Sequence, residues 1–154
     1  MGIHTSAVPL DRVGALLKRE EGHFVDMKAR EIAPGKLTRS LSAFANADGG
    51  EIYVGIAQNP DKTFRWDGFS NEEAANAHIQ VIDQFFPIGS ISRCEFLRCS
   101  AVSGIVLFIE VGKTSDIRYS SDKLPYLRRG AQNLPIDSPD KLERLRLNKG
   151  ITTF

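Results

Sequence analysis

The chain has 154 residues, of which 42% are hydrophobic and 25% charged, and this composition is typical of one globular domain with its own core. A formal net charge of +1 excludes a basic field over the whole surface, so a nucleic acid would have to bind a local patch. The longest apolar run, Gly104 to Val111, is too short to span a membrane, and the N-terminus has no signal-peptide pattern. We therefore expect a single cytoplasmic domain over residues 1–154, without a membrane partner.

A helix and a strand are predicted at the start of the chain. Leu10 to Arg19 repeats apolar residues at helical spacing, and Gly22 follows as a stop. His23 to Lys28 then alternates like a strand, with Asp26 and Lys28 on the same side. This segment places two charged side chains on one face of the sheet.

A second helix and a buried strand come next. After a break at Pro34, Lys36 to Ala47 has the spacing of an amphipathic helix, and it ends at the double glycine Gly49-Gly50. Glu51 to Ala57 is a nearly continuous apolar run, which is typical of a strand buried on both faces. We expect this strand at the centre of the sheet.

The second half of the chain predicts a helix and a hairpin. Ser70 and Glu73 have the spacing of a capping box, which indicates a helix that runs to about Phe86. Ile91 to Cys99 and Ile105 to Val111 flank a glycine turn and predict an antiparallel hairpin.

The end of the chain completes the predicted fold. Cys94 and Cys99 are five residues apart on a strand, so they lie on opposite faces and should not pair. Pro125 to Arg128 reads as a short strand, and Ser138-Pro139 begins a helix over Asp140 to Asn148. This order of elements predicts an α/β (α+β) fold with a mixed sheet of about five to six strands flanked by helices.

Asp26 and Lys28 are the first candidates for chemistry. The carboxylate could hold a divalent metal while the ammonium group orients a water or stabilises phosphate charge. Glu21, or Glu20 beside it, lies where it could share that metal. The same residues could instead form a surface ion pair and a solvated charge run.

A polar and cationic cluster surrounds Gly130. It contains an aromatic ring, two arginines and two amides, from Tyr126, Arg128, Arg129, Gln132 and Asn133. Arginine suits phosphate, and aromatic rings suit base stacking. Three cations that follow the first predicted strand extend this patch: Arg30, Lys36 and Arg39. A simple solvated surface is the alternative.

Phe44 to Gly50 is rich in small residues, which let a helix run tightly into a strand. Packing alone would explain them, but the amide of Asn46 near a buried turn is expected to form hydrogen bonds. The sequence has no Walker loop, no GxGxxG and no catalytic serine–histidine–aspartate signature.

Taken in order, these segments resemble the Schlafen-type, AlbA-like family of nucleic-acid-binding domains. The family pattern reads approximately E-S-x-x-x-E-F-K, then S-A-F-A-N-x-x-G-G, then G-V-D-D, and much later Y-x-R-x-G. The corresponding segments here are Glu21 to Lys28, Ser42 to Gly50, Gly55 to Gln58 and Tyr126 to Gly130. The resemblance extends from about Glu21 to Asn133 and is most specific in the second segment.

The resemblance implies a mixed α/β domain that binds nucleic acid. Some relatives are metal-dependent ribonucleases that act on structured RNA such as tRNA through three carboxylates. Two of these positions map onto Glu21 and Asp26, and the third falls on Gln58. An amide coordinates divalent metal more weakly than a carboxylate, which leaves Asp61 or Asp67 to complete the set.

Three functions follow from this interpretation. The first is backbone-directed binding of RNA or DNA in a bacterial regulator or defence protein. The predicted binding residues are Lys28, Arg30, Lys36, Arg39, Tyr126, Arg128 and Arg129. The second is an endoribonuclease in which Glu21 and Asp26 hold Mg²⁺ or Mn²⁺ and Lys28 lies near the scissile phosphate. The third is a non-enzymatic interaction or oligomerisation module, which the near-neutral net charge favours. A homo-oligomer is a possible partner arrangement under each of these readings.

Three further expectations concern geometry and extent. Glu21, Asp26 and Gln58 should converge on one side of the sheet. The last predicted helix offers a rival basic surface through Lys141, Arg144 and Lys149. The apolar ending after this helix predicts that the chain is the N-terminal piece of a longer protein with a further C-terminal domain.

Overall fold

The computed structural model describes residues 3–86 and 91–151. A mixed five-stranded sheet with the strand order β1-β6-β7-β3-β2 forms its centre. The strands are β1 (Thr5–Ala7), β2 (Val25–Lys28), β3 (Gly50–Val54), β6 (Ile91–Arg98) and β7 (Ile105–Val111). β1 pairs in parallel with β6 and β2 in parallel with β3, whereas β7 runs antiparallel to both of its neighbours. The predicted α+β fold with a mixed sheet is therefore confirmed.

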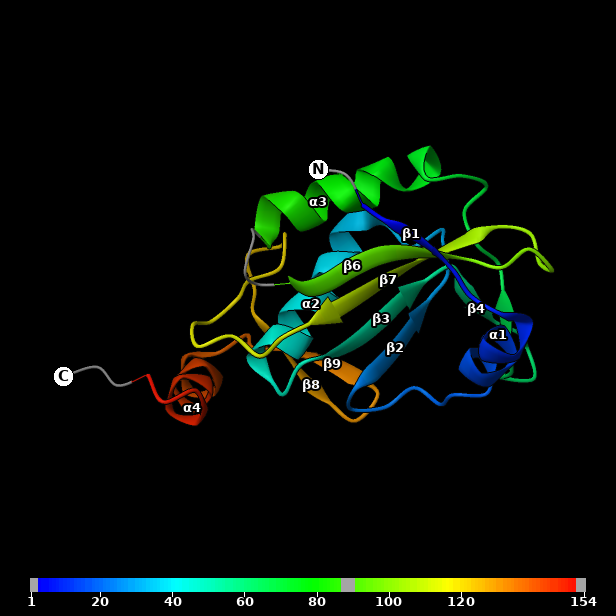
Figure 1. Ribbon diagram of the computed structural model, residues 1–154. Coiled ribbons are helices and arrows are strands. Elements are labelled where there is room, and N and C mark those ends of the chain that lie inside the picture. The colour runs from blue at the N-terminus through cyan, green and yellow to red at the C-terminus, as the bar shows by residue number, and fades with distance from the viewer. Residues whose placement is uncertain (1–2, 87–90, 152–154) are drawn as a thin grey trace.

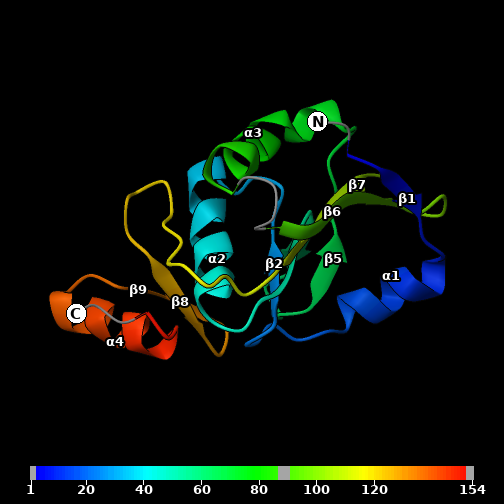
Figure 2. The same cartoon turned by 60° about the vertical axis from the view of Figure 1, so that its left-hand side comes forward.

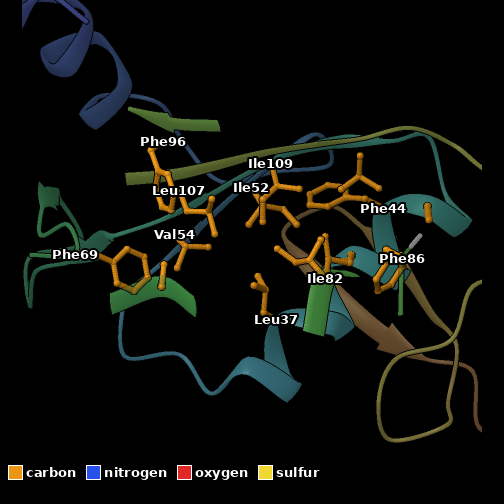
Figure 3. Close-up of a cluster of buried hydrophobic side chains, with 14 of the residues drawn as sticks. Leu37, Phe44, Ile52, Val54, Phe69, Ile82, Phe86, Phe96, Leu107 and Ile109 are labelled. Carbon is orange, nitrogen blue, oxygen red and sulfur yellow. The ribbon is translucent and has the colours of Figure 1, made fainter. Parts of the chain in front are cut away.

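Helices cover both faces of this sheet (Figure 1). α2 (Pro34–Asn46) and α3 (Asn76–Phe85) lie on one face, and α1 (Leu10–Leu17) packs on the other. A short 3-10 helix, η1 (Glu73–Ala75), precedes α3. Figure 3 shows the larger core, where Leu37 and Phe44 of α2 lie among side chains of α3 and the sheet. Removal of these side chains from water is the main force that joins the layers.

Two hairpins and a last helix lie outside the main sheet. β4 (Ile56–Gln58) pairs with β5 (Phe64–Trp66), and β8 (Tyr126–Arg129) pairs with β9 (Gln132–Pro135). α4 (Pro139–Asn148) follows β9 and lies beside the β8–β9 hairpin in both views (Figures 1 and 2). α2 therefore has the sheet on one side and the β8–β9 hairpin on another (Figure 2).

Asn46 joins α2 to the chain that leads into β8. Its Nδ2 donates to the carbonyls of Arg118 at 2.8 Å and Tyr126 at 2.9 Å, and its Oδ1 accepts from the Arg118 amide at 2.8 Å. Ser42, one turn earlier, accepts from the Tyr126 amide at 2.9 Å. The expected hydrogen-bonding role of Asn46 is confirmed, and it fixes the start of the hairpin against α2.

The predicted helices all form, with ends that shift by a few residues. The last helix begins as expected, because Ser138 Oγ accepts from the Lys141 amide. The capping box predicted at Ser70 and Glu73, before α3, does not form. Asn71 Oδ1, rather than the hydroxyl of Ser70, accepts from the Ala74 amide at 3.0 Å. Asparagine is as good a capping residue as serine, so the sequence alone did not separate the two.

The predicted strand from Glu51 to Ala57 is divided at Gly55. β3 ends at Val54, and Gly55 has a φ of +116°, which sends β4 out of the main sheet into its own hairpin. β3 lies between β2 and β7, so it is an interior strand as its burial predicted, although β7 holds the middle position. Sequence reasoning missed β1, β5 and β9, each of which has only three or four residues.

The two cysteines do not pair with each other, as their spacing predicted. Cys94 packs against the core beneath α2 and α3, whereas Cys99 belongs to the core on the α1 side, and both are free. Within residues 3–86 and 91–151, no helix has both the length and the apolar character that crossing a bilayer requires.

The division at Gly55 predicts opposite effects for two glycine substitutions. Gly55→Ala should lower the free energy of unfolding by about 1–3 kcal/mol, because L-residues are strained at this φ. An added Cβ would also lie 3.1 Å from the Gly68 Cα. Gly14→Ala, inside α1 with no atom within 4 Å of the added Cβ, should stabilise by up to about 1 kcal/mol. Urea unfolding of both variants measures the difference, and equal effects would contradict it.

Candidate functional site

Asp26 lies at the centre of the predicted site, but it is buried. Its side chain on β2 is 2% exposed and faces α2. Ser40 Oγ of α2 donates to Asp26 Oδ2 at 2.8 Å. The ammonium group of Lys28 and the guanidinium of Arg128 lie 3.3 Å and 3.5 Å from the same oxygen. Asp26 is thus a buried carboxylate with two cations beside it.

Arg128 enters this cluster from β8 and is itself 2% exposed. Its Nε donates to the Gly22 carbonyl at 3.0 Å and its Nη2 to the Val25 carbonyl at 2.9 Å. Its Nη1 donates to Asn133 Oδ1 at 2.8 Å, and the guanidinium lies 4.8 Å from the centre of the Phe44 ring. The prediction that Arg128 belongs to a solvent-facing basic surface is wrong, because every nitrogen of its side chain already has an acceptor inside the protein.

A backbone amide of the edge strand β2 holds the side chain of Glu21 near Asp26 and Arg128. Its Oε2 accepts from the Met27 amide at 3.0 Å. Partial burial and a hydrogen bond with Asp26 raise the pKa of Glu21 to about 7. Glu21 therefore lies close to Asp26, and its raised pKa favours the protonated form of Glu21 below about pH 7.

The third predicted position does not complete a metal site. The Gln58 side chain is exposed, and its amide donates to the Lys62 carbonyl within the β4–β5 hairpin. Asp61 accepts from Thr63 in the same turn, and Asp67 lies 3.9 Å from Arg65. Over residues 3–86 and 91–151, no group of three histidine, cysteine or acidic side chains is arranged to hold a metal.

The residues that are present do not fit a divalent cation. A metal such as Mg²⁺ needs several oxygen ligands with little competing positive charge. Here the guanidinium of Arg128 and the ammonium of Lys28 already lie against Asp26, and Ser40 donates to it. Glu21 and Asp26 therefore act as hydrogen-bonding partners, and no hydrolytic step follows from this cluster.

Most of the predicted phosphate-binding residues have other partners. Arg30 donates to the Gly68 carbonyl and pairs with Glu31, and Arg39 pairs with Asp122 at 3.4 Å. Tyr126, expected to stack on bases, is 7% exposed and donates its hydroxyl proton to Asp122 at 2.6 Å. Its ring packs inside the protein and is not a stacking surface.

Lys36 and Arg129 do not form one connected face. Lys36 lies in the first turn of α2, whereas Arg129 borders a hollow with Asn46 and Asp48 at the other end of this helix. At a rise of about 1.5 Å per residue, the ten residues from Lys36 to Asn46 separate the two ends by about 15 Å. The predicted surface therefore breaks into separate parts.

A different basic surface forms where the β8–β9 hairpin meets α4. Arg129 and Lys113 line a hollow of about 310 Å³, and Arg129 and Arg144 line an adjoining groove of about 340 Å³. All three side chains are exposed, and within the described part of the chain none of them has an acidic partner within 4.0 Å. We call Lys113, Arg129 and Arg144 the hairpin–helix surface.

Only part of this surface could be predicted from the sequence. The sequence predicts Arg144 on a rival surface of the last helix, but the fold brings it next to Arg129. Lys113 follows β7 without any motif around it, so nothing local marked it. Lys149, also assigned to the rival surface, turns inward and donates to the Ala45 carbonyl at 3.0 Å. Burial lowers the pKa of Lys149 to about 8.

The contrast between two adjacent arginines gives a stability prediction. Arg128→Ala should lower the free energy of unfolding by about 3–5 kcal/mol, because it leaves the buried Asp26 with Lys28 as its remaining cationic neighbour. Arg129→Ala should change it by no more than about 0.5 kcal/mol, because this side chain is exposed. Chemical denaturation measures both, and similar values would show that Arg128 is not structural.

The raised pKa of Glu21 gives a prediction about pH. The folded state binds this proton more tightly than the unfolded state, whose pKa is near 4.5, so the stabilising effect is present below pH 4.5. It is lost as the pH rises to about 7. Glu21→Gln removes this titration, so the stability of the variant relative to the wild type should increase over that interval.

Unfolding curves at several pH values between 4.5 and 8 test this effect. Glu20→Gln is the matched control, because it removes the same charge from the exposed neighbouring position. A stability difference between Glu21→Gln and the wild type that stays constant with pH would contradict the raised pKa of Glu21.

Comparison with known proteins identifies the family and supports the fold. The model of the family described as "Schlafen, AlbA_2" matches residues 21–137. Among solved structures, the DIP2311 protein from Corynebacterium diphtheriae superposes with a TM-score of 0.58 at 20% sequence identity. The alignment covers 94% of this chain but 32% of that one, so this chain spans about a third of its length. At this identity the likeness concerns the fold alone.

A search of curated proteins finds no match. The family model covers most of the chain, and it includes Glu21, Asp26 and the arginines of β8. The chain therefore belongs to the Schlafen AlbA_2 family.

Proposed function

We propose that this domain binds the phosphate backbone of a nucleic acid through the hairpin–helix surface. The observation that carries the proposal is the gathering of Lys113, Arg129 and Arg144, which come from three separate segments, around two adjoining hollows. Membership of the Schlafen AlbA_2 family agrees with a function that involves nucleic acid.

The charges of this surface explain why phosphate is the favoured ligand. Many other exposed cations are paired with acids, as Arg19 is with Glu51 and Arg98 with Glu72. Lys113, Arg129 and Arg144 have no acidic partner within 4.0 Å among the described residues, and Asp48, which lines the same hollow as Lys113 and Arg129, pairs with His23. Arginine also matches the geometry of phosphate oxygens through its planar donors.

Binding of this kind does not depend on base sequence. Contacts to phosphate fix the position of a protein on a nucleic acid but carry no direct sequence information. Tyr126, the aromatic ring expected to stack on bases, is buried.

We further propose that the domain lies in the cytoplasm, because its two free cysteines suit a reducing compartment.

The salt dependence of binding tests the proposal. Arg129→Ala combined with Arg144→Ala should make the slope of log K against log salt less steep by roughly 1.8 on duplex DNA, and by roughly 1.4 on single strands. Fluorescence anisotropy with labelled RNA and DNA of mixed sequence measures this slope, and it also separates the two ligands.

The control is a second pair of exposed cations at the other end of the molecule. Arg12 lies in α1 and Lys18 directly after it, and the described residues offer neither an acidic side-chain partner within 4.0 Å. Arg12→Ala combined with Lys18→Ala removes the same charge. Equal weakening by both double variants would mean that net charge, and not the hairpin–helix surface, controls binding.

A further inference from the structure

The groove between the β8–β9 hairpin and α4 has an aliphatic floor. Leu127 of β8, Leu134 of β9, Ile136 and Leu145 of α4 line it, and its volume is about 340 Å³. The side chain of Leu134 is 37% exposed, although contact between apolar surface and water is energetically unfavourable. Concave, mostly apolar surfaces of this size are typical of binding sites.

The rim of this groove is cationic. Arg129 lines it from the hairpin, and Lys141 and Arg144 line it from α4. Lys141 pairs with Asp137 at 2.8 Å, but both of these side chains are more than half exposed. Arg129 and Arg144 have no acidic partner within 4.0 Å among the described residues. A ligand that covers the floor would therefore bring its own negative charges to the rim.

We propose that this groove docks an acidic, amphipathic peptide segment of a protein partner. Its aliphatic side chains would cover Leu134 and Leu145, and its carboxylates would pair with Arg129 and Arg144. Amphipathic helices bind hydrophobic grooves in this way, with apolar anchors on one side. Complementary charges at the rim would select an acidic segment over a basic one.

The lining favours a peptide over a nucleotide. Bases bind to proteins largely by stacking on aromatic rings. Among the described residues, no aromatic side chain lines this groove, and its floor is formed by leucine, isoleucine and proline side chains. Peptide docking would be a second activity of this region. The proposed nucleic-acid binding needs only the cationic side chains, and both activities would use Arg129 and Arg144.

A titration with designed peptides tests the docking site. The probe is a short synthetic helix of leucine and glutamate with its leucines on one face. One comparison peptide has the same residues in scrambled order, and another has lysine in place of glutamate. Amide NMR spectra of the domain should change at Leu127, Leu134 and Leu145 with the acidic amphipathic probe and not with the others.

Matched variants then locate the contact. Leu134→Asp and Arg144→Glu should each weaken binding of the probe at least about tenfold, because they remove apolar burial and a cation respectively. Leu147→Asp makes the same change on α4 at a residue that is 60% exposed and does not line the groove, so the affinity should be retained. Lys113→Ala should weaken nucleic-acid binding and leave the peptide unaffected.

Two results would overturn this inference. The first is binding of the scrambled peptide as tightly as the amphipathic one, or spectral changes that fall outside the groove. The second is a loss of nucleic-acid binding in Leu134→Asp without any loss of peptide binding, which would assign the groove to the nucleic acid. Failure of the phosphate proposal would appear separately, as an unchanged salt slope with peptide binding intact.

Discussion

An ion pair that is almost wholly shielded from water, between Asp26 of β2 and Arg128 of β8, joins the edge of the main sheet to the β8–β9 hairpin. Removing two charges from water is costly, and the attraction between them offsets this only when further hydrogen bonds satisfy both groups. Those bonds are present here. Ser40 donates to Asp26, while Arg128 donates to Asn133 and to two backbone carbonyls. The position of the hairpin, and with it Arg129 at the surface, depends on this arrangement.

The same cluster also protects an exposed edge of the sheet. β2 is an edge strand, and unpaired backbone groups on such a strand invite association with other chains. Arg128 donates to the carbonyl of Val25, and Glu21 accepts from the amide of Met27. The acidic and basic residues that resemble a ribonuclease site therefore cover the edge of the sheet, and the ligand surface that we propose lies at the hairpin and α4.

How much the sequence could predict depends on how local each signal is. The helices and the β6–β7 hairpin have strong apolar periodicity, and the SAFAN segment around Asn46 carried the family resemblance. Short strands such as β1 and β9 have too few residues to show a period. Arg128 and Arg129 are adjacent in sequence and have the same chemistry, yet one is buried and one exposed. Side chains alternate along a strand, so one of the two faces inward, but which one is buried depends on Asp26, which lies about a hundred residues away along the chain.

A double-mutant cycle between Asp26 and Arg128 tests the central claim most directly. The free energy of unfolding is measured for Asp26→Asn, for Arg128→Met, for the two changes combined, and for the wild type. If the pair holds the hairpin to the sheet, the double variant is much less destabilised than the sum of the single ones, with a coupling energy of about 1–3 kcal/mol. Additive effects, with a coupling energy below about 0.5 kcal/mol, would contradict the account.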